Sequence, residues 1–210
     1  MLLIPKLSVL WGGGSVSSIS IFGTNTASAA SITLPASINA GDFIILDQFT
    51  RNIGLPASVT PSGFTNIYDF NDGNNKSMLD VKIAVGNEGG TSVTGMDGIN
   101  DYKTVTVVRG NKPIKSYTVN SQNTQSTSGN PTAQSCTAVN GPTPLIIMAH
   151  WASDGTVNPR TASPAMDAEL SPNVNFYTGY KIYNSSPATH SIDMDDEGGN
   201  QLASLYFSFS

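Results

Sequence analysis

The sequence predicts an all-β protein, an antiparallel two-sheet sandwich that is jelly-roll-like and has pseudo-duplicated halves. Ser, Thr and Asn together make up 65 of the 210 residues, whereas only 12% of the residues are charged. Such a composition suits short strands joined by many turns, and it lacks the Leu, Glu, Lys and Arg that build helix surfaces. Short apolar or alternating runs, separated by Gly, Pro and Asn, recur along the chain, as they do in sandwiches and jelly rolls.

The first half supplies six expected strands. Val16–Phe22 alternates apolar and hydroxyl residues, as a half-buried strand does. Phe43–Phe49 is almost continuously apolar, which suits the centre of a sandwich, and a Gly-rich turn region is expected over Asn87–Gly98. The expected strands are Val16–Phe22, Ser31–Leu34, Phe43–Phe49, Pro61–Ile67, Met78–Val85 and Lys103–Arg109.

The second half supplies a shorter set of expected strands after a long polar stretch. Asn120–Ser135 contains Ala133 as its one apolar residue, which is typical of a solvated loop. The strands expected around this loop are Tyr117–Val119, Leu145–Ala152, Phe176–Tyr183, His190–Met194 and Leu202–Phe209.

A weak internal repeat relates the two halves, with a nearly constant offset along the chain. The matched segments are Phe43–Phe49 with Leu145–Trp151, Pro61–Phe64 with Pro164–Met166, Val81–Ala84 with Tyr180–Tyr183, Ser92–Asp97 with Ser191–Asp195, and Lys103–Arg109 with Ala203–Phe209. Two such halves could form two domains or interleave into one sandwich. Because each half alone has few strands and a small core, one pseudo-symmetric sandwich is favoured.

The predicted organisation is an N-terminal arm, residues 1–15, followed by a single β-sandwich domain, residues 16–210, with half-repeats at about 40–110 and 142–210. The arm is apolar and precedes the Gly-Gly-Gly at 12–14, and exposed apolar segments usually mark an interface. It is therefore expected to pack on the sandwich's own face or to dock into a neighbouring subunit, with docking preferred. The expected interface residues are Leu2, Leu3, Ile4, Leu7, Val9, Leu10 and Trp11.

Charge and apolar content argue against several classes of protein. The net charge is −5 and no stretch concentrates Lys or Arg, so a nucleic-acid partner is not expected. Cys136 is the single cysteine, which excludes an internal disulfide. No apolar run is long enough to span a membrane, and the broken apolar start does not fit a signal peptide.

Acidic residues cluster at Asp193–Asn200, where Asp193, Asp195 and Glu197 echo the first half of a calcium-binding loop. That loop needs a bidentate Glu at its twelfth position, which here is Ser204 in an apolar strand. These three residues are therefore weak metal candidates. The preferred interpretation is a solvated acidic hairpin turn, with no cofactor expected.

The sequence predicts no enzyme. His150 and His190 are expected on exposed or half-buried strand positions, and no Gly-x-Ser-x-Gly elbow accompanies them. Cys136 has no cationic neighbour in the sequence and is expected to be a small buried residue. Carboxylates are mostly scattered in turns, which disfavours the convergent pair of a glycan hydrolase.

Aromatic side chains could form a platform for sugars, but strand aromatics are more often core residues or cross-strand pairs. The core interpretation is preferred because these residues fall on both faces of their strands. The set comprises Tyr68, Phe70, Trp151, Tyr177, Tyr180 and Tyr183.

Several short motifs, in this order, resemble a known family. They are Leu34-Pro35, Ala40-Gly41-Asp42 before the strand Phe43–Leu46, Pro61-Ser62-Gly63-Phe64-Thr65, Ala84-Val85-Gly86 and Val108-Arg109-Gly110. The family consists of β-sandwich virion and surface proteins, found in tailed-phage tail, fibre and capsid-decoration proteins and on bacterial surfaces. The resemblance runs from about Val16 to the C-terminus, and it brings no catalytic residues with it.

What the resemblance implies is a structural protein of a tailed-phage virion: a capsid decoration, collar or tail-attachment component. Its partners would be other virion proteins and further copies of itself. Family members are often one module of a longer protein, whereas here the module stands almost alone, which favours a small component over a long fibre. The alternative is a glycan-binding module that recognises a host surface, with Asp193–Asn200 as the first place to look.

Overall fold

The computed structural model describes residues 15–51, 59–71, 75–94, 100–126, 134–137, 144–153, 157–163, 165–173, 175–185, 189–196 and 200–210. Every regular element in these ranges is a β-strand, and all the strand pairs are antiparallel. The predicted all-β, antiparallel sandwich is confirmed. Residues 1–14, including the whole expected arm interface, lie outside the described residues.

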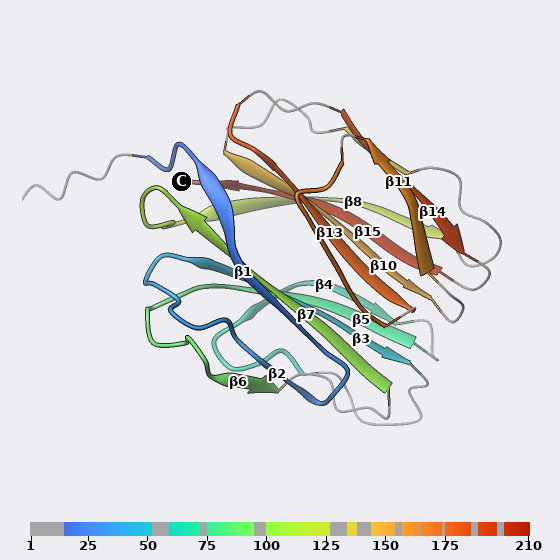
Figure 1. The fold of residues 1–210 in the computed structure, drawn as a ribbon, viewed down its shortest axis with the longest axis horizontal. Helices are drawn as coiled ribbons and strands as arrows, with labels where there is room; N and C mark the ends of the chain where they lie inside the picture. Colours follow the sequence, from blue (N-terminus) through green and yellow to red (C-terminus); the bar gives the residue numbers. More distant parts are fainter. Residues whose placement is uncertain are drawn as a thin grey trace, which may run out of the picture.

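Two five-stranded sheets form the body of the molecule (Figure 1). Sheet I has the order β1 (Ile19–Ala27), β7 (Asn100–Gly110), β3 (Phe43–Arg51), β5 (Asn75–Ile83), β4 (Thr65–Asn71). Sheet II has the order β12 (Ala168–Asn173), β13 (Phe176–Tyr183), β10 (Leu145–Ser153), β15 (Asn200–Phe209), β8 (Tyr117–Ser126).

Two smaller sheets complete the fold. A ribbon of β2 (Ser31–Thr33) and β6 (Ser92–Thr94) lies against the outer side of sheet I, away from sheet II (Figure 1). Three further strands, in the order β11 (Val157–Ser163), β14 (Thr189–Asp196), β9 (Gln134–Thr137), lie beyond sheet II.

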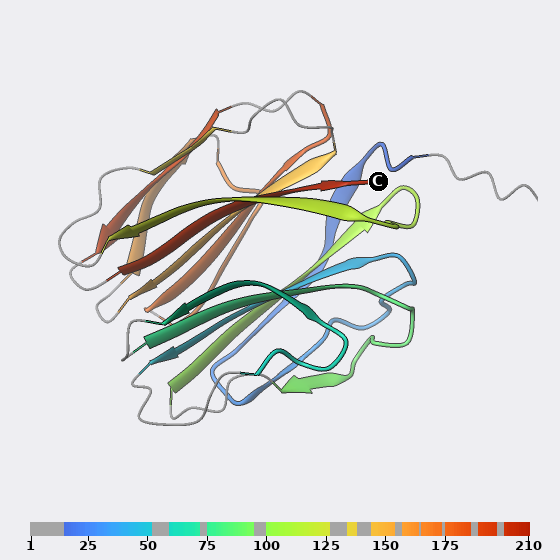
Figure 2. The ribbon, with the colours of Figure 1, turned by 180° about the vertical axis from the view of Figure 1, so that it is seen from behind.

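Each large sheet is built from one half of the chain, as the colours of Figure 2 show. The strands that the repeat matches occupy equivalent places: β3 and β10 are central, and β5 with β13 and β7 with β15 flank them. The halves therefore do not interleave but face each other across a shared core. This order gives no support to jelly-roll connectivity, in which the chain crosses repeatedly between the sheets.

The almost continuous apolar character of β3 follows from burial on both faces. Phe43 and Ile45 face sheet II in the main core, whereas Ile44 and Leu46 pack under the β2–β6 ribbon. Successive side chains of a strand point to opposite faces, so a strand covered on both sides reads as an apolar run rather than an alternation. At 25 cal/mol/Å², each such buried side chain contributes roughly 2 kcal/mol.

A tight turn leads into β3. Gly41 has φ +85°, and an added Cβ would lie 2.4 Å from Cβ of Pro113. The neighbouring Asp42 accepts hydrogen bonds from Nε and Nη2 of Arg109, at 2.8 and 2.6 Å. This pairing raises the Arg109 pKa and ties the start of β3 to the end of β7.

Several expected elements differ from the structure. β8 continues through Ser126, and β9 begins at Gln134, so both ends of the expected polar loop Asn120–Ser135 are strands. β6 lies within the expected turn region Asn87–Gly98, and none of the expected strands covers β11 or β12. These strands are short or at sheet edges, where backbone pairing needs no apolar pattern.

Candidate functional site

A cluster of polar side chains lies between the two large sheets, and we call Asp47, Ser77, Thr104, His150 and Thr178 the interlayer cluster. In sheet I, Asp47 of β3 is opposite Thr104 of β7. In sheet II, His150 of β10 is opposite Thr178 of β13. The two cross-strand pairs face each other, and Ser77 of β5 completes the set.

Hydrogen bonds connect the interlayer cluster across the core. His150 Nδ1 is 2.9 Å from Asp47 Oδ2, and His150 Nε2 is 3.0 Å from Ser77 Oγ. Thr178 Oγ1 donates to Asp47 Oδ2 at 2.6 Å and lies 3.3 Å from Thr104 Oγ1. Buried polar groups are destabilising unless they are paired, and here each contact joins one buried group to another.

The expectation that His150 lies on an exposed or half-buried face is wrong. His150 is 1% exposed, and its ring packs near Tyr68 and Phe176, at centroid distances of 6.1 and 5.4 Å. Burial, together with the nearby charge of Asp47, raises the pKa of the Tyr68 hydroxyl. A histidine at an inward position of a central strand needs buried partners, and those come from distant segments.

Ser77, His150 and Asp47 have the connectivity of a nucleophile, a base and an orienting carboxylate. Their surroundings, however, differ from those of a working triad. The three residues are 0%, 1% and 1% exposed, so a substrate has no path to Ser77 Oγ in this structure. The arrangement is suited to holding the two sheets in a fixed relative position.

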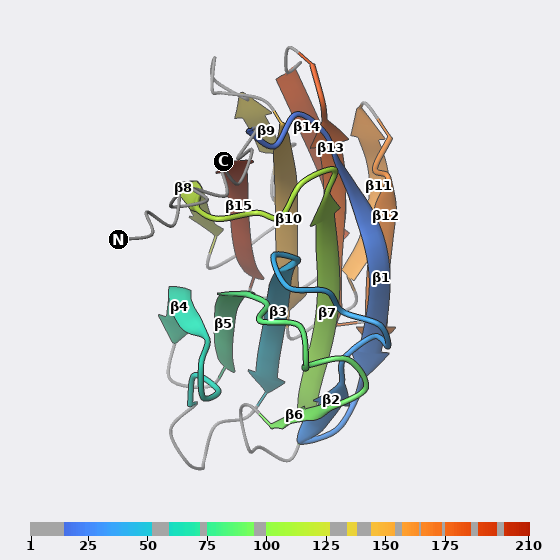
Figure 3. The ribbon, with the colours of Figure 1, turned by 90° about the vertical axis from the view of Figure 1, so that its left-hand side faces the viewer.

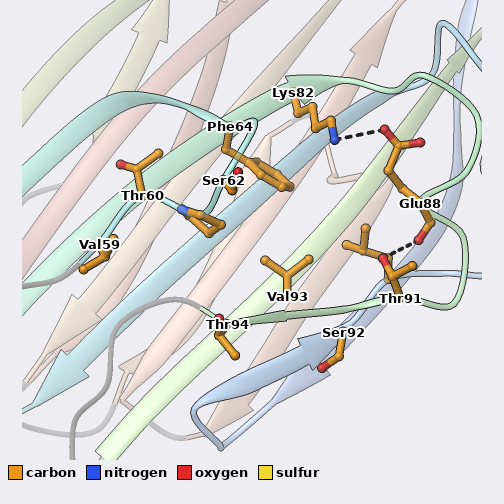
Figure 4. A pocket seen from close by; sticks show the side chains of 12 residues that line it. Val59, Thr60, Ser62, Phe64, Lys82, Glu88, Thr91, Ser92, Val93 and Thr94 are labelled. Carbon is orange, nitrogen blue, oxygen red and sulfur yellow. Dashed lines mark hydrogen bonds and ion pairs between the residues drawn. The ribbon is translucent and has the colours of Figure 1, made fainter.

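A second candidate site is a surface pocket of about 500 Å³ on the outer side of sheet I (Figure 4). It lies between the segment Val59–Phe64, the end of β5 and the β2–β6 ribbon. This volume is within the range typical of small-molecule sites. Its lining residues are Leu34, Val59, Thr60, Pro61, Ser62, Phe64, Lys82, Glu88, Thr91, Ser92, Val93 and Thr94. We call it the β6 pocket.

Asp80 of β5 holds the segment that begins at Thr60, which forms one wall of the β6 pocket. Its carboxylate accepts hydrogen bonds from Thr60 Oγ1 at 3.0 Å, Asn66 Nδ2 at 3.0 Å and Gln48 Nε2 at 2.7 Å. Burial raises the Asp80 pKa even though these bonds act to lower it. A turn follows Thr60, in which the Phe64 N–H donates to the Pro61 carbonyl at 3.0 Å. The Phe64 ring is thereby placed over the pocket.

Glu88 fixes the opposite wall. Its carboxylate accepts the backbone N–H groups of Val85, Gly86 and Asn87, at 2.8 to 3.0 Å, and pairs with Lys82 Nζ at 3.0 Å. Burial acts to raise the Glu88 pKa, but these four donors outweigh it and lower the pKa to about 2. The Glu88 carboxylate is therefore ionised at neutral pH.

Apolar and hydroxyl groups alternate around the β6 pocket. Lys82 Nζ lies 5.8 Å from the centroid of the Phe64 ring, and Figure 4 shows that ring between Lys82 and Val93. The rim carries the exposed residues Ser62, Ser92 and Thr94. Such a site offers apolar area, hydroxyls and one ammonium group to a ligand.

Sequence reasoning did not single out Phe64, Lys82 or Glu88 as site residues. The available signal was the segment Pro61–Thr65, noted above as part of the resemblance. The proline and glycine mark a turn that presents an aromatic side chain. Nothing in the sequence, however, indicates that β6, some 30 residues later, forms the other wall.

The proposed metal residues are not brought into a calcium-type loop. Asp193 and Asp195 belong to β14, opposite Thr161 and Asn158 of β11, so the expected acidic turn is wrong over 193–196. Glu197 lies outside the described residues. Within the described ranges, no group of three or more His, Cys, Asp or Glu side chains is placed to hold a metal ion.

The aromatic set is largely core, as the sequence predicted. Trp151, Tyr177 and Tyr180 are at most 1% exposed, Tyr68 is 8% exposed, and Phe70 and Tyr183 are half-buried.

Cys136 of β9 is opposite His190 of β14 in the strand register, and the side chains of both lie outside the described part of the structure.

The part of the chain that the structure describes contains no helix of the length and apolar character needed to cross a membrane. No family model matches the sequence, and comparisons with curated proteins and with solved structures found no match.

Proposed function

We propose that this chain is a structural protein of a tailed-phage virion, such as a capsid-decoration, collar or tail-attachment component, which acts through protein–protein contacts. The proposal continues the resemblance of the ordered motifs between Leu34 and Gly110. It agrees with the interlayer cluster, in which the residues best suited to catalysis are buried and bonded to one another.

One observation on the fold carries the proposal: among the described strands, the edge strands β4 and β8 have no further strand paired with their outer edges. β1 and β12 contact each other at one side, whereas β4 and β8 are the terminal strands at the other (Figure 3). Half-buried apolar side chains accompany these two edge strands, namely Ile67, Phe70, Tyr117 and Val119. Terminal strands with apolar neighbours favour edge pairing and apolar contact with another chain.

The N-terminal arm gives the proposal its first test. The molar mass of the full chain and of a chain beginning at Ser15 is measured by light scattering, with circular dichroism to verify that both are folded. An oligomer that becomes a monomer without residues 1–14 supports assembly through the arm. A full chain that stays monomeric, alone and when mixed with proteins of its virion, contradicts the proposed function.

A second candidate function is a glycan-binding module for host-surface recognition. The β6 pocket favours it, because aromatic side chains with surrounding polar groups suit amphipathic ligands. A glycan array probed with the full chain tests this function. Binding to a defined glycan supports it, and the absence of binding on a broad array contradicts it.

A further inference from the structure

The edge strands of the described sheets differ in how well they are protected from pairing with another chain. A free edge presents backbone N–H and C=O groups, and proteins protect such edges with charges, prolines, bulges or short strands. β1 and β4 each contain an irregularity in strand register, and β12 contains Glu169 and Pro172. In the small sheets, β2, β6 and β9 are only three or four residues long, and β11 contains Pro159. Each of these edges therefore carries a feature that discourages pairing.

β8 has none of these protective features. Tyr117–Ser126 spans ten residues without a charged side chain or a proline. Its pairing with β15 runs without a register shift from Tyr117, opposite Phe209, to Ser126, opposite Asn200. In the part of the chain that the structure describes, no strand pairs with the outer edge of β8 (Figure 3). A long, regular and uncharged edge of this kind is a template for a further strand.

The hydrogen bonds just before β8 show which backbone groups its outer edge offers. The Ser116 N–H donates to the Ser210 carbonyl and the Ser210 N–H donates to the Ser116 carbonyl, both at 3.1 Å. Antiparallel pairing alternates between residues that exchange two hydrogen bonds and residues that exchange none. Because the register is uninterrupted, every second residue counted from Ser116 bonds to β15. The residues between them direct their N–H and C=O groups to the outer edge, and they are Tyr117, Val119, Ser121, Asn123 and Gln125.

We propose that the outer edge of β8 pairs with β8 of a second copy of this chain, antiparallel and across a twofold axis at Ser121. In this register Tyr117 is opposite Gln125 of the second copy, Val119 is opposite Asn123 of the second copy, and the two Ser121 residues are opposite each other. The outward-directed backbone groups of both strands are then all paired, and the two copies of sheet II join into one continuous sheet. A register centred on another residue leaves some of these groups unpaired.

A second copy fits this edge because β8 is complementary to itself. Twofold pairing places the same strand on both sides of the contact, and the outward groups of β8 are arranged symmetrically about Ser121. Although each chain has a net charge of −5, β8 contributes no charge that would face its own copy. The half-buried Tyr117 and Val119, which pack against the main core, gain further cover from the added strand. Because the pair uses the β8 edge of both copies, it closes as a dimer instead of growing into a fibre.

This inference rests on the proposed function, because it assigns the protein–protein contacts of that function a surface and a partner. Its register is tested by oxidation of the full chain with Cys136→Ser as the background, which removes the native cysteine. Opposite residues that exchange hydrogen bonds have Cα atoms about 5.5 Å apart, which a disulfide can bridge. Thr124 lies three residues from the axis, so its two copies would be about 20 Å apart.

We therefore expect Ser121→Cys to form a covalent dimer and Thr124→Cys, in the same strand, to form none. Similar cross-linking at both positions, or none at Ser121, overturns the inference. This comparison needs no disruptive substitution, since both variants replace one small side chain of the same strand by another.

A second measurement tests the backbone pairing itself. Asn123→Pro removes an outward N–H but no hydrogen bond to β15, and the twofold axis doubles the loss. We expect self-association, measured by analytical ultracentrifugation, to weaken at least about tenfold. Asn123→Thr is the matched control, because it changes the same side chain and keeps the N–H, and we expect it to leave self-association unchanged. Circular dichroism verifies that both variants are folded.

The outcomes separate this inference from the proposed function. A dimer that Asn123→Pro weakens and Asn123→Thr does not supports the inference. An oligomer that both variants leave intact overturns the β8 pairing but not assembly, which would then use another surface, such as the arm. A full chain that is monomeric also overturns the inference, whereas the proposed function fails only if the chain does not bind proteins of its virion either.

Discussion

Asp47 and His150 lie in different sheets and 103 residues apart, yet Oδ2 of one is 2.9 Å from Nδ1 of the other in the centre of the core. The contact joins the two halves of the chain at their central strands, β3 and β10. Because apolar contact alone is non-directional, a polar contact at this place can fix how the sheets are positioned on each other. The buried Thr104, Thr178 and Ser77 add further contacts between the two sheets.

Substitution of Asp47 therefore tests how much the interlayer cluster stabilises the fold. Asp47→Ala removes the buried carboxylate that both His150 Nδ1 and Thr178 Oγ1 contact, and we expect a loss of about 3 kcal/mol in the free energy of unfolding, measured in urea. Asp69→Ala is the control, because Asp69 forms an ion pair with Lys76 but is 46% exposed, and such pairs contribute about 1 kcal/mol at most. Equal effects of the two variants would contradict a stabilising role for the cluster.

Glu88 predicts a pH dependence of stability with a defined sign. Its pKa is about 2 in the folded chain against 4.5 for an unperturbed Glu, so the unfolded chain binds the proton more readily. The stabilisation is fully present above pH 4.5 and is lost as the pH falls towards 2. Two and a half pKa units correspond to about 3 kcal/mol at most.

The free energy of unfolding of the native chain and of Glu88→Gln is therefore to be compared from pH 7 to pH 2. We expect the native chain to be more stable at pH 7 and the difference to shrink below pH 4.5. A difference that stays constant over this range would show that the Glu88 charge does not support the walls of the β6 pocket.

Substitutions of two glycines distinguish the cost of a strained backbone from the cost of a steric clash. Gly41 and Gly90 both have positive φ, +85° and +72°, but an added Cβ meets Pro113 at Gly41 and nothing within 4 Å at Gly90. Gly90→Ala is expected to lower the free energy of unfolding by about 1 kcal/mol, and Gly41→Ala by about 2 kcal/mol more. Chemical denaturation gives both values, and similar losses at the two sites would show that the Gly41–Pro113 contact relaxes freely.

The elements that were predictable from the sequence are those whose burial leaves a pattern. β3 and β10 lie in the centres of their sheets with both faces covered, so they appear as apolar runs. β8 is different, because its residues Asn120–Ser126 pair with β15 through the backbone and contain no apolar side chain. An edge strand of this kind is indistinguishable from a polar loop in the sequence.

The candidate sites were less predictable than the strands, because their residues are far apart along the chain. The partners of His150 are Asp47 and Ser77, which come from two other strands and meet it only after the sheets have packed. The β6 pocket similarly combines Phe64 with Val93, from segments that show no sequence relation. Local patterns indicate which strands form, but not which inward polar residues will face each other.

We infer that the interlayer cluster holds the two sheets together and that Ser77 does not act as a nucleophile. The test is to incubate the folded full chain with a fluorophosphonate, which labels serines activated by a histidine, and to map the products by mass spectrometry. Because Ser77 is 0% exposed and its Oγ lies 3.0 Å from His150 Nε2, we expect no modification of Ser77. Stoichiometric modification of Ser77 that His150→Gln abolishes would contradict it, and would identify an accessible nucleophile in place of a structural contact.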